Sequence, residues 1–144
     1  MKMQKLIILL LFFLLLTINK SFAEEFEVKH ADSLEADQNE IKIKGNIFVI
    51  FNGARINGSE GIIKINEENK PYEATFFNRA KIELKDRNVE ADKITILIPQ
   101  KTILAEGNTA SELNDSNNNK MKITSDSQTL NWKGEDATAK GNLK

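Results

Sequence analysis

The sequence contains no cysteine, only one histidine and only two prolines. Without cysteine the chain can form neither a disulfide nor a thiolate zinc site. His30 is the only histidine on which a Ser-His-Asp triad could be built, and a solvated strand histidine explains it better. No glycine-rich phosphate loop is present. These absences argue against an enzyme, and no cofactor is predicted.

Charge of one sign is also lacking, since 20 Lys and Arg oppose 21 Asp and Glu and the formal net charge is −1. Nucleic-acid surfaces need clustered cations, so a nucleic-acid partner is not predicted. Asp115 and Asp126 lie near asparagines and could offer oxygen ligands to calcium. Their spacing matches no calcium loop, so no metal site is predicted.

The one long hydrophobic run lies at the start of the chain, from Leu6 to Leu16. Lys2 and Lys5 precede it, and Ser21-Phe22-Ala23 places small residues where a signal peptidase reads them. The run is short of the ~20 residues that a spanning helix needs. We therefore predict a cleaved signal peptide over residues 1–23 and one domain over 24–144. An uncleaved membrane anchor is the alternative.

Beyond this run, the most informative stretch is NVEADKITILIPQKTILAEGN, residues 88–108. Ile94, Ile96 and Ile98 alternate with Thr95 and Leu97, which is the period of a strand with two unlike faces. Pro99 favours a turn because it has no N–H to donate to a sheet. The stretch predicts two short strands joined by a tight turn, with an acidic residue at its start and Gly-Asn at its end.

Versions of this unit recur along the chain. Each has an acidic residue first and Gly-Asn last: Asp32 with Gly45-Asn46, Asp92 with Gly107-Asn108 and Asp126 with Gly141-Asn142, and more weakly Glu60 with Phe77-Asn78. A supersecondary unit repeated in this way predicts an array of hairpin-like pieces that share one core.

Other segments add detail to this pattern. The apolar run Ile47–Phe51 predicts a strand covered on both faces. Asn52-Gly53 and Asn57-Gly58 are predicted turns, and 114–120 is a predicted polar loop. No helix is predicted after residue 23. The chain therefore predicts an all-β domain of ten or more short antiparallel strands, folded as a sandwich, jelly roll or solenoid.

In these units the sequence resembles the LptA/OstA-like family of periplasmic lipopolysaccharide-transport bridge proteins. The resemblance is carried by Lys44-Gly45-Asn46-Ile47, by Val89-Glu90-Ala91-Asp92 and by Leu104-Ala105-Glu106-Gly107-Asn108. Lys70-Pro71 followed by Ala74-Thr75-Phe76-Phe77 is similar to the middle of the family.

The resemblance implies a twisted, partly open β-jelly roll in the periplasm, whose two sheets enclose an apolar groove for lipid A acyl chains. It also implies end-to-end self-association by strand pairing, between an inner-membrane LptC-type subunit and an outer-membrane LptD-type translocon. By strand parity we expect the groove to be lined by Ile43, Ile47, Ile65, Phe76, Ile82, Ile94, Ile96, Ile98 and Trp132.

Two alternatives to a lipopolysaccharide carrier stay open at this point. One is a membrane-anchored LptC-like subunit of the same export complex. The other is a β-solenoid structural protein whose interior is filled by its own side chains and binds no ligand.

Overall fold

The structure is a computed structural model that describes residues 26–114, 116–132 and 136–142. The predicted signal peptide lies outside these residues. The described chain forms eleven strands: β1 (Phe26–His30), β2 (Ser33–Ala36), β3 (Glu40–Phe51), β4 (Ala54–Ile65), β5 (Pro71–Phe77), β6 (Ala80–Glu83), β7 (Arg87–Ala91), β8 (Lys93–Leu97), β9 (Thr102–Asn114), β10 (Lys120–Asn131) and β11 (Ala137–Lys140).

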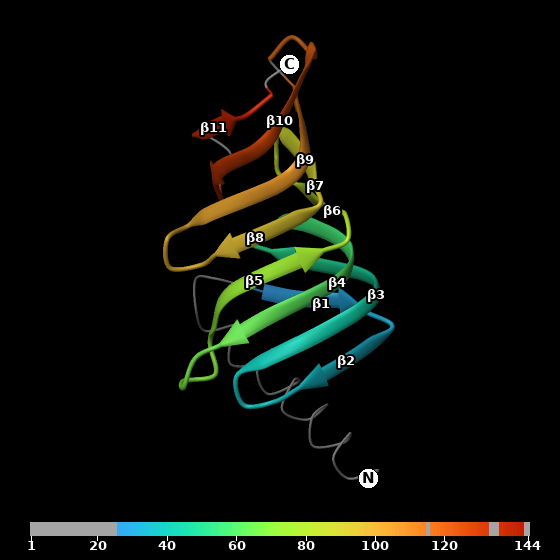
Figure 1. The fold of residues 1–144 in the computed structure, drawn as a ribbon, viewed down its shortest axis with the longest axis vertical. Coiled ribbons are helices and arrows are strands. Elements are labelled where there is room, and N and C mark those ends of the chain that lie inside the picture. The colour runs from blue at the N-terminus through green and yellow to red at the C-terminus, as the bar shows by residue number, and fades with distance from the viewer. Residues whose placement is uncertain (1–25, 115, 133–135, 143–144) are drawn as a thin grey trace.

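All strand pairs are antiparallel and belong to one continuous eleven-stranded sheet, which bends into two layers. The first layer, here called sheet I, runs from β2 through the start of β3, the end of β4, β5, β8, the start of β9 and the end of β10 to β11. Sheet II is formed by β1, the end of β3, the start of β4, β6, β7, the end of β9 and the start of β10. Figure 1 shows sheet I as a ladder rising from β2 to β10, with β1 and β6 behind it.

Four long strands belong to both sheets because each bends from one to the other. The pairing register shifts at these bends, between Lys44 and Ile47 in β3 and between Ser125 and Ser127 in β10. The sequence-based prediction that Gly45-Asn46 and Gly107-Asn108 end strands is therefore wrong. β3 and β9 continue through these dipeptides, which instead turn each strand into the opposite sheet.

A recurring acidic residue holds the bends of β3, β9 and β10. The main-chain N–H groups of Asp32, Asp92 and Asp126 donate to the carbonyls of Gly45, Gly107 and Gly141, each at 2.9 Å. The amides of Asn46, Asn108 and Asn142 then donate to the same three carboxylates at 3.1, 3.0 and 3.3 Å. We call each set an Asp–Gly–Asn corner.

Glycine is required at the corner for two reasons. Gly107 has a φ of +82°, a left-handed conformation that disfavours a side chain. A Cβ there would also lie 2.7 Å from the Asp92 carboxylate oxygen. The following Asn108, at φ +45°, is one of the few residue types that tolerate this region. The repeat found in the sequence is thus a repeat of corners.

The weak fourth copy of the repeat is a corner of different composition. Asn78 and Arg79, with φ of +58° and +69°, carry the chain from β5 in sheet I to β6 in sheet II. The Ser59 hydroxyl donates to the Asn78 carbonyl at 3.2 Å, and the Arg79 N–H donates to the Asp92 carbonyl at 3.2 Å. This corner is held by its neighbours, since it has no Asp-Gly pair of its own.

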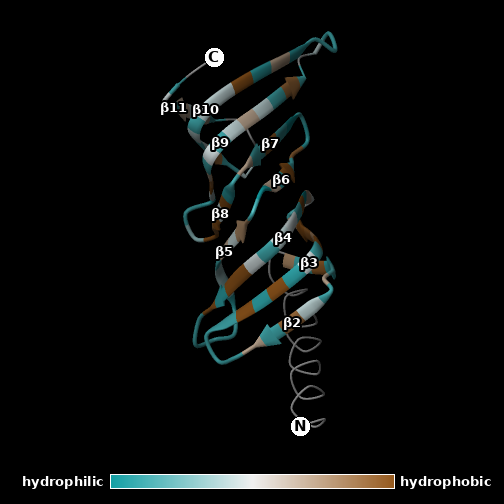
Figure 2. Ribbon diagram, turned by 45° about the vertical axis from the view of Figure 1, so that its right-hand side comes forward, coloured by the Kyte–Doolittle hydropathy of each residue, from teal (hydrophilic) through white to brown (hydrophobic). Residues whose placement is uncertain are grey.

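The core lies between the two sheets and is built from every second residue of most strands. Figure 2 shows the resulting bands of apolar and polar residues along β3 and β4. Phe48 and Ile50, on the other face of sheet II, are only half-buried, so the expectation of a strand covered on both faces is wrong there. Asn57-Gly58 is not a turn but part of β4, whereas Asn52-Gly53 does form the turn between β3 and β4.

The all-β fold and its jelly-roll-like arrangement are as the sequence predicts. The described residues contain no helix. The predicted short strands hold for most elements, but β3, β4 and β10 have 12 residues and β9 has 13. The corners explain this difference, since each lets one strand serve two sheets.

Candidate functional site

The nine residues expected to line a groove all face the interior. Sheet I contributes Ile43, Ile65, Phe76, Ile94 and Ile96, with Ile98 directly after β8, and sheet II contributes Ile47 and Ile82. These eight side chains are buried, and five of them have no exposed surface at all. Trp132, directly after β10, is half-buried and packs against the same cluster. The interior is therefore one continuous apolar core, filled by its own side chains in this state.

The interior becomes more polar toward the C-terminal end of the molecule. Four polar residues on the inner faces of β9 and β10, Thr109, Ser111, Ser125 and Gln128, are buried there. The Gln128 amide donates across the corner to the Ile123 carbonyl at 3.3 Å. Further out on the same end, Met121 is 58% exposed and Ile123 is half-buried. The apolar lining thus gives way to buried polar side chains before the exposed Met121.

One inward-facing cation also lies in this part of the molecule. Arg87 has the same strand parity as the buried Val89 and Ala91. Its Nε is buried and has no hydrogen-bond partner among the described residues. Burial lowers the pKa of Arg87 because the charged form loses solvation.

Two rows of turns face each other on the side opposite the corners, which we call the open side. The β3–β4 and β6–β7 turns belong to sheet II, and the β4–β5 and β8–β9 turns belong to sheet I. Trp132 crosses from sheet I to sheet II, where its ring meets Phe51 at a centroid distance of 4.7 Å and an interplanar angle of 89°. Phe51 in turn lies 5.6 Å from Phe26 of β1. These three rings join the sheets across the open side.

A half-open cavity of about 690 Å³ lies beside this aromatic contact. It is lined by the β3–β4 turn, the β6–β7 turn and Trp132: Asn52, Gly53, Ala54, Arg55, Glu83, Leu84, Lys85, Asp86 and Trp132. Of these residues, the sequence predicts only Trp132 as a candidate site residue, and Asn52-Gly53 only as a turn. The cavity forms between hairpins that are distant in sequence, so no local pattern could have located it.

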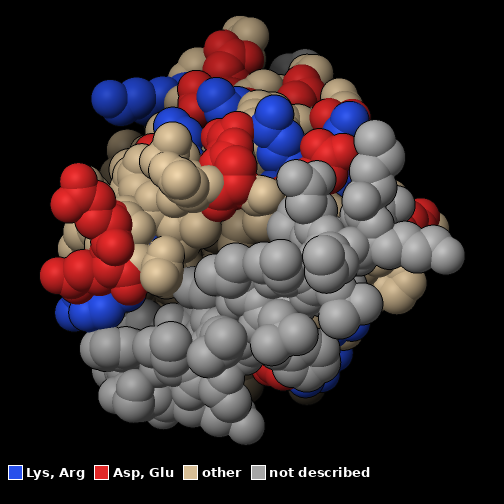
Figure 3. All heavy atoms as spheres, turned by 90° about the horizontal axis from the view of Figure 1, so that it is seen from below, with Lys and Arg blue, Asp and Glu red and all other residues tan. Residues whose placement is uncertain are grey.

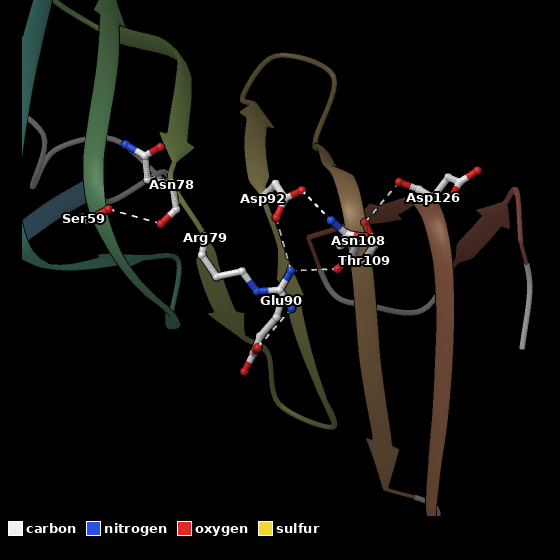
Figure 4. A network of polar contacts seen from close by, with 8 residues as sticks. All are labelled: Ser59, Asn78, Arg79, Glu90, Asp92, Asn108, Thr109 and Asp126. Carbon is white, nitrogen blue, oxygen red and sulfur yellow. Dashed lines mark hydrogen bonds and ion pairs between the residues drawn. The ribbon is translucent and has the colours of Figure 1, made fainter.

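The corner side, in contrast, is closed by a polar network (Figure 4). The Arg79 guanidinium donates to the Asn108 carbonyl at 2.8 Å and lies 3.4 Å from Glu90 and 3.5 Å from Asp92. The Thr109 hydroxyl donates to the Asp126 carbonyl at 3.4 Å. These contacts link successive corners, so we expect the two sheets to separate at the open side rather than here.

Within the described part of the chain, each end of the sheets has strand edges that pair with no other strand, and the excess charge at the two ends is of opposite sign. At the N-terminal end, β1 and β2 are edge strands, and acidic residues around them outnumber basic ones: Glu27, Asp32, Glu35, Asp37 and Glu40 against Lys29, Lys42 and Lys44. Figure 3, viewed from that end, shows groups of acidic side chains with basic side chains among them. At the other end, the edge strands β10 and β11 carry Lys120, Lys122 and Lys140. Edges of this kind can pair with another strand.

Catalytic or metal chemistry finds little support in the described part of the chain. No group of three or more acidic or histidine side chains there is placed to hold a metal ion. His30 is exposed on its strand and its Nδ1 lies 2.8 Å from the Asn46 carbonyl. Over the same residues, no helix has the length and apolar character needed to cross a membrane.

Comparison with known proteins identifies the fold. No family model matches the chain, and no curated protein matches it. Among solved structures it is similar to LptH from Pseudomonas aeruginosa, described as the LptA-homologous periplasmic component of the lipopolysaccharide transport device. The TM-score is 0.65 at 15% sequence identity, over 79% of this chain and 80% of that chain. The chain therefore has an LptA-like fold. Its neighbour is a transport component.

Proposed function

We propose that this protein is a periplasmic lipopolysaccharide carrier that holds acyl chains between its sheets and passes them along end-to-end assemblies. The supporting observation is the apolar interior, which runs from Phe26 in the edge strand β1 to Leu130 near the end of β10, within a fold shared with LptH. Acyl chains need a continuous dry path, whereas sugars and phosphates can remain in water.

Because the interior is filled in this state, ligand entry requires the sheets to separate. The corners tie the sheets together on one side through main-chain hydrogen bonds. The open side is joined across the gap by the packing of Trp132 on Phe51. We therefore place the entry of the acyl chains at the open side, with the inward residues of β5 and β8, including Phe76 and Ile96, as the lining.

The ends provide the means of assembly. Pairing of β11 with β2 of a second copy would extend sheet I, and pairing of β10 with β1 would extend sheet II. The acidic N-terminal edge and the basic C-terminal edge favour this head-to-tail order over pairing of like ends. The same edges are the proposed contacts with an inner-membrane LptC-type subunit and an outer-membrane LptD-type translocon.

The proposal is tested by the lipid that co-purifies with the protein. Mass spectrometry of the organic extract is expected to find lipopolysaccharide, and the delipidated protein is expected to take it up again. Absence of any acylated lipid, together with no uptake, would identify the filled interior as a purely structural core.

A further inference from the structure

The cavity on the open side has a lining of mixed charge, which restricts what it can bind. Arg55 and Lys85 are donors, while Glu83 and Asp86 are acceptors. Of the four charged groups only Glu83 has an ion-pair partner among the described residues, Lys81 at 3.6 Å. Three charged side chains thus remain available around one cavity.

This arrangement fits a sugar better than an anion. A phosphate is anionic and mainly accepts hydrogen bonds, so Arg55 and Lys85 would attract it, whereas Glu83 and Asp86 would repel it and stay without a donor. Sugar hydroxyls both donate and accept, and can therefore use the acidic and the basic groups at once. The Trp132 ring also lines the cavity. Because an aromatic ring is a large apolar surface, it can pack against the C–H face of a sugar ring.

The cavity also adjoins the apolar interior. Trp132 lines it and at the same time contacts Phe51, which is a core residue. A single amphiphile can therefore place its chain in the core and its polar head in the cavity. We propose that the cavity bounded by Trp132, Arg55 and Asp86 binds a sugar ring of the amphiphile whose apolar chains occupy the interior. This inference rests on the proposed function.

Trp132 makes the test direct, because it is the only tryptophan in the chain and its emission reports on this cavity. The full-length protein is titrated with dodecyl maltoside and with dodecyl phosphate, below the concentrations at which either forms micelles. The two probes share a chain and differ only in the head. Dodecyl maltoside is expected to bind about tenfold more tightly, the equivalent of one or two additional hydrogen bonds.

A substitution assigns the preference to the cavity. Asp86→Ala is expected to weaken dodecyl maltoside binding about five- to tenfold and to leave dodecyl phosphate binding unchanged or tighter. The matched control is Glu112→Ala, which removes an acidic side chain on β9, opposite Lys122 and outside the cavity. The control is expected to retain the full preference.

The outcomes separate the two proposals. Equal affinity for the two probes, a preference for dodecyl phosphate, or an Asp86→Ala variant with an unchanged preference overturns the sugar site, while the apolar interior still binds chains. If neither amphiphile binds, the interior does not open to chains, and both proposals fail.

Discussion

Trp132 and Phe51 come from opposite sheets, and their rings meet edge to face with centroids 4.7 Å apart. They are separated by most of the chain, yet this contact lies where the two rows of turns face each other. The shared apolar core lies between this contact and the corners, where main-chain hydrogen bonds hold the bends. The two sheets are thus held together by main-chain hydrogen bonds on the corner side and by side-chain packing on the open side. We expect the side-chain packing to break more easily.

Replacing Trp132 with alanine is expected to loosen the open side. Replacing a fully buried tryptophan with alanine lowers the free energy of unfolding by about 3–5 kcal/mol. Because Trp132 is only half-buried, we expect Trp132→Ala to lower it by about 2–3 kcal/mol. The free energy of unfolding is measured by circular dichroism in urea. The rate of uptake of a fluorescent fatty acid is expected to rise as stability falls. Loss of stability with unchanged uptake would place the entry elsewhere.

Much of the strand pattern could be predicted from the sequence, because alternation is a local signal. Ile94, Ile96 and Ile98 show it, and all three are buried. The role of Gly107-Asn108 could not be predicted in the same way. A positive φ suits a turn and a strand bend equally well. What decides between them is the hydrogen bond from the Asp92 N–H to Gly107, which depends on how the strands pair.

The open side was still less predictable. Phe51 has the parity of Ile47 and Val49, so its inward direction could have been found from the pattern. Its contact with Trp132 joins the ends of two strands from opposite halves of the chain. Periodicity indicates which face of a strand is buried, not which element covers it, and the cavity beside Trp132 depends on the latter.

The corners can be tested with a matched pair of glycine substitutions. Gly107 and Gly53 have nearly identical φ values, +82° and +83°. A Cβ at Gly107 would meet the Asp92 side chain, whereas a Cβ at Gly53 has no atom within 4 Å. Gly53→Ala is expected to lower the free energy of unfolding by about 1 kcal/mol through backbone strain alone. Gly107→Ala is expected to cost about 2–4 kcal/mol, since the contact adds to the strain.

Urea unfolding of both variants gives the comparison. The difference between them isolates the tight approach of the Asp92 carboxylate to the corner. Equal destabilisation would show that the corner tolerates a side chain, and that glycine recurs there for its backbone conformation only.

End-to-end association is expected to depend on the charges of the edge strands. Lys120→Glu combined with Lys122→Glu places acidic groups on the β10 edge, opposite the acidic edge of a second copy. Self-association measured by analytical ultracentrifugation is expected to weaken about three- to tenfold at low salt, and less as salt screens the charges. Lys81→Glu, away from both ends on β6, is the control. Equal effects of the two changes would argue against edge pairing.

Asp37, in the turn before β3, is expected to make the stability of the protein depend on pH in the acidic range. The main-chain N–H groups of Asn39 and Glu40 donate to the Asp37 carboxylate at 2.7 and 2.9 Å, and these bonds lower its pKa below the ordinary value. These two hydrogen bonds therefore stabilise the folded state near neutral pH, and this stabilisation is lost as the pH falls through the lowered pKa of Asp37.

A titration followed by NMR gives the pKa of Asp37 directly, and it is expected to lie below that of an unstructured aspartate. Asp37→Asn is expected to reduce the loss of stability between pH 7 and pH 3, because the group no longer titrates. An ordinary pKa at Asp37 would contradict this account of the turn.

The central claim is that acyl chains occupy the space between the sheets. It is tested most directly by photo-crosslinking in cells from an unnatural amino acid at Phe76 or Ile96, which face inward, and at Leu97, the next residue on β8, which faces outward. Our account predicts lipopolysaccharide adducts from positions 76 and 96 and none from 97. Absence of adducts from both inward positions, or equal yields from all three, would contradict it.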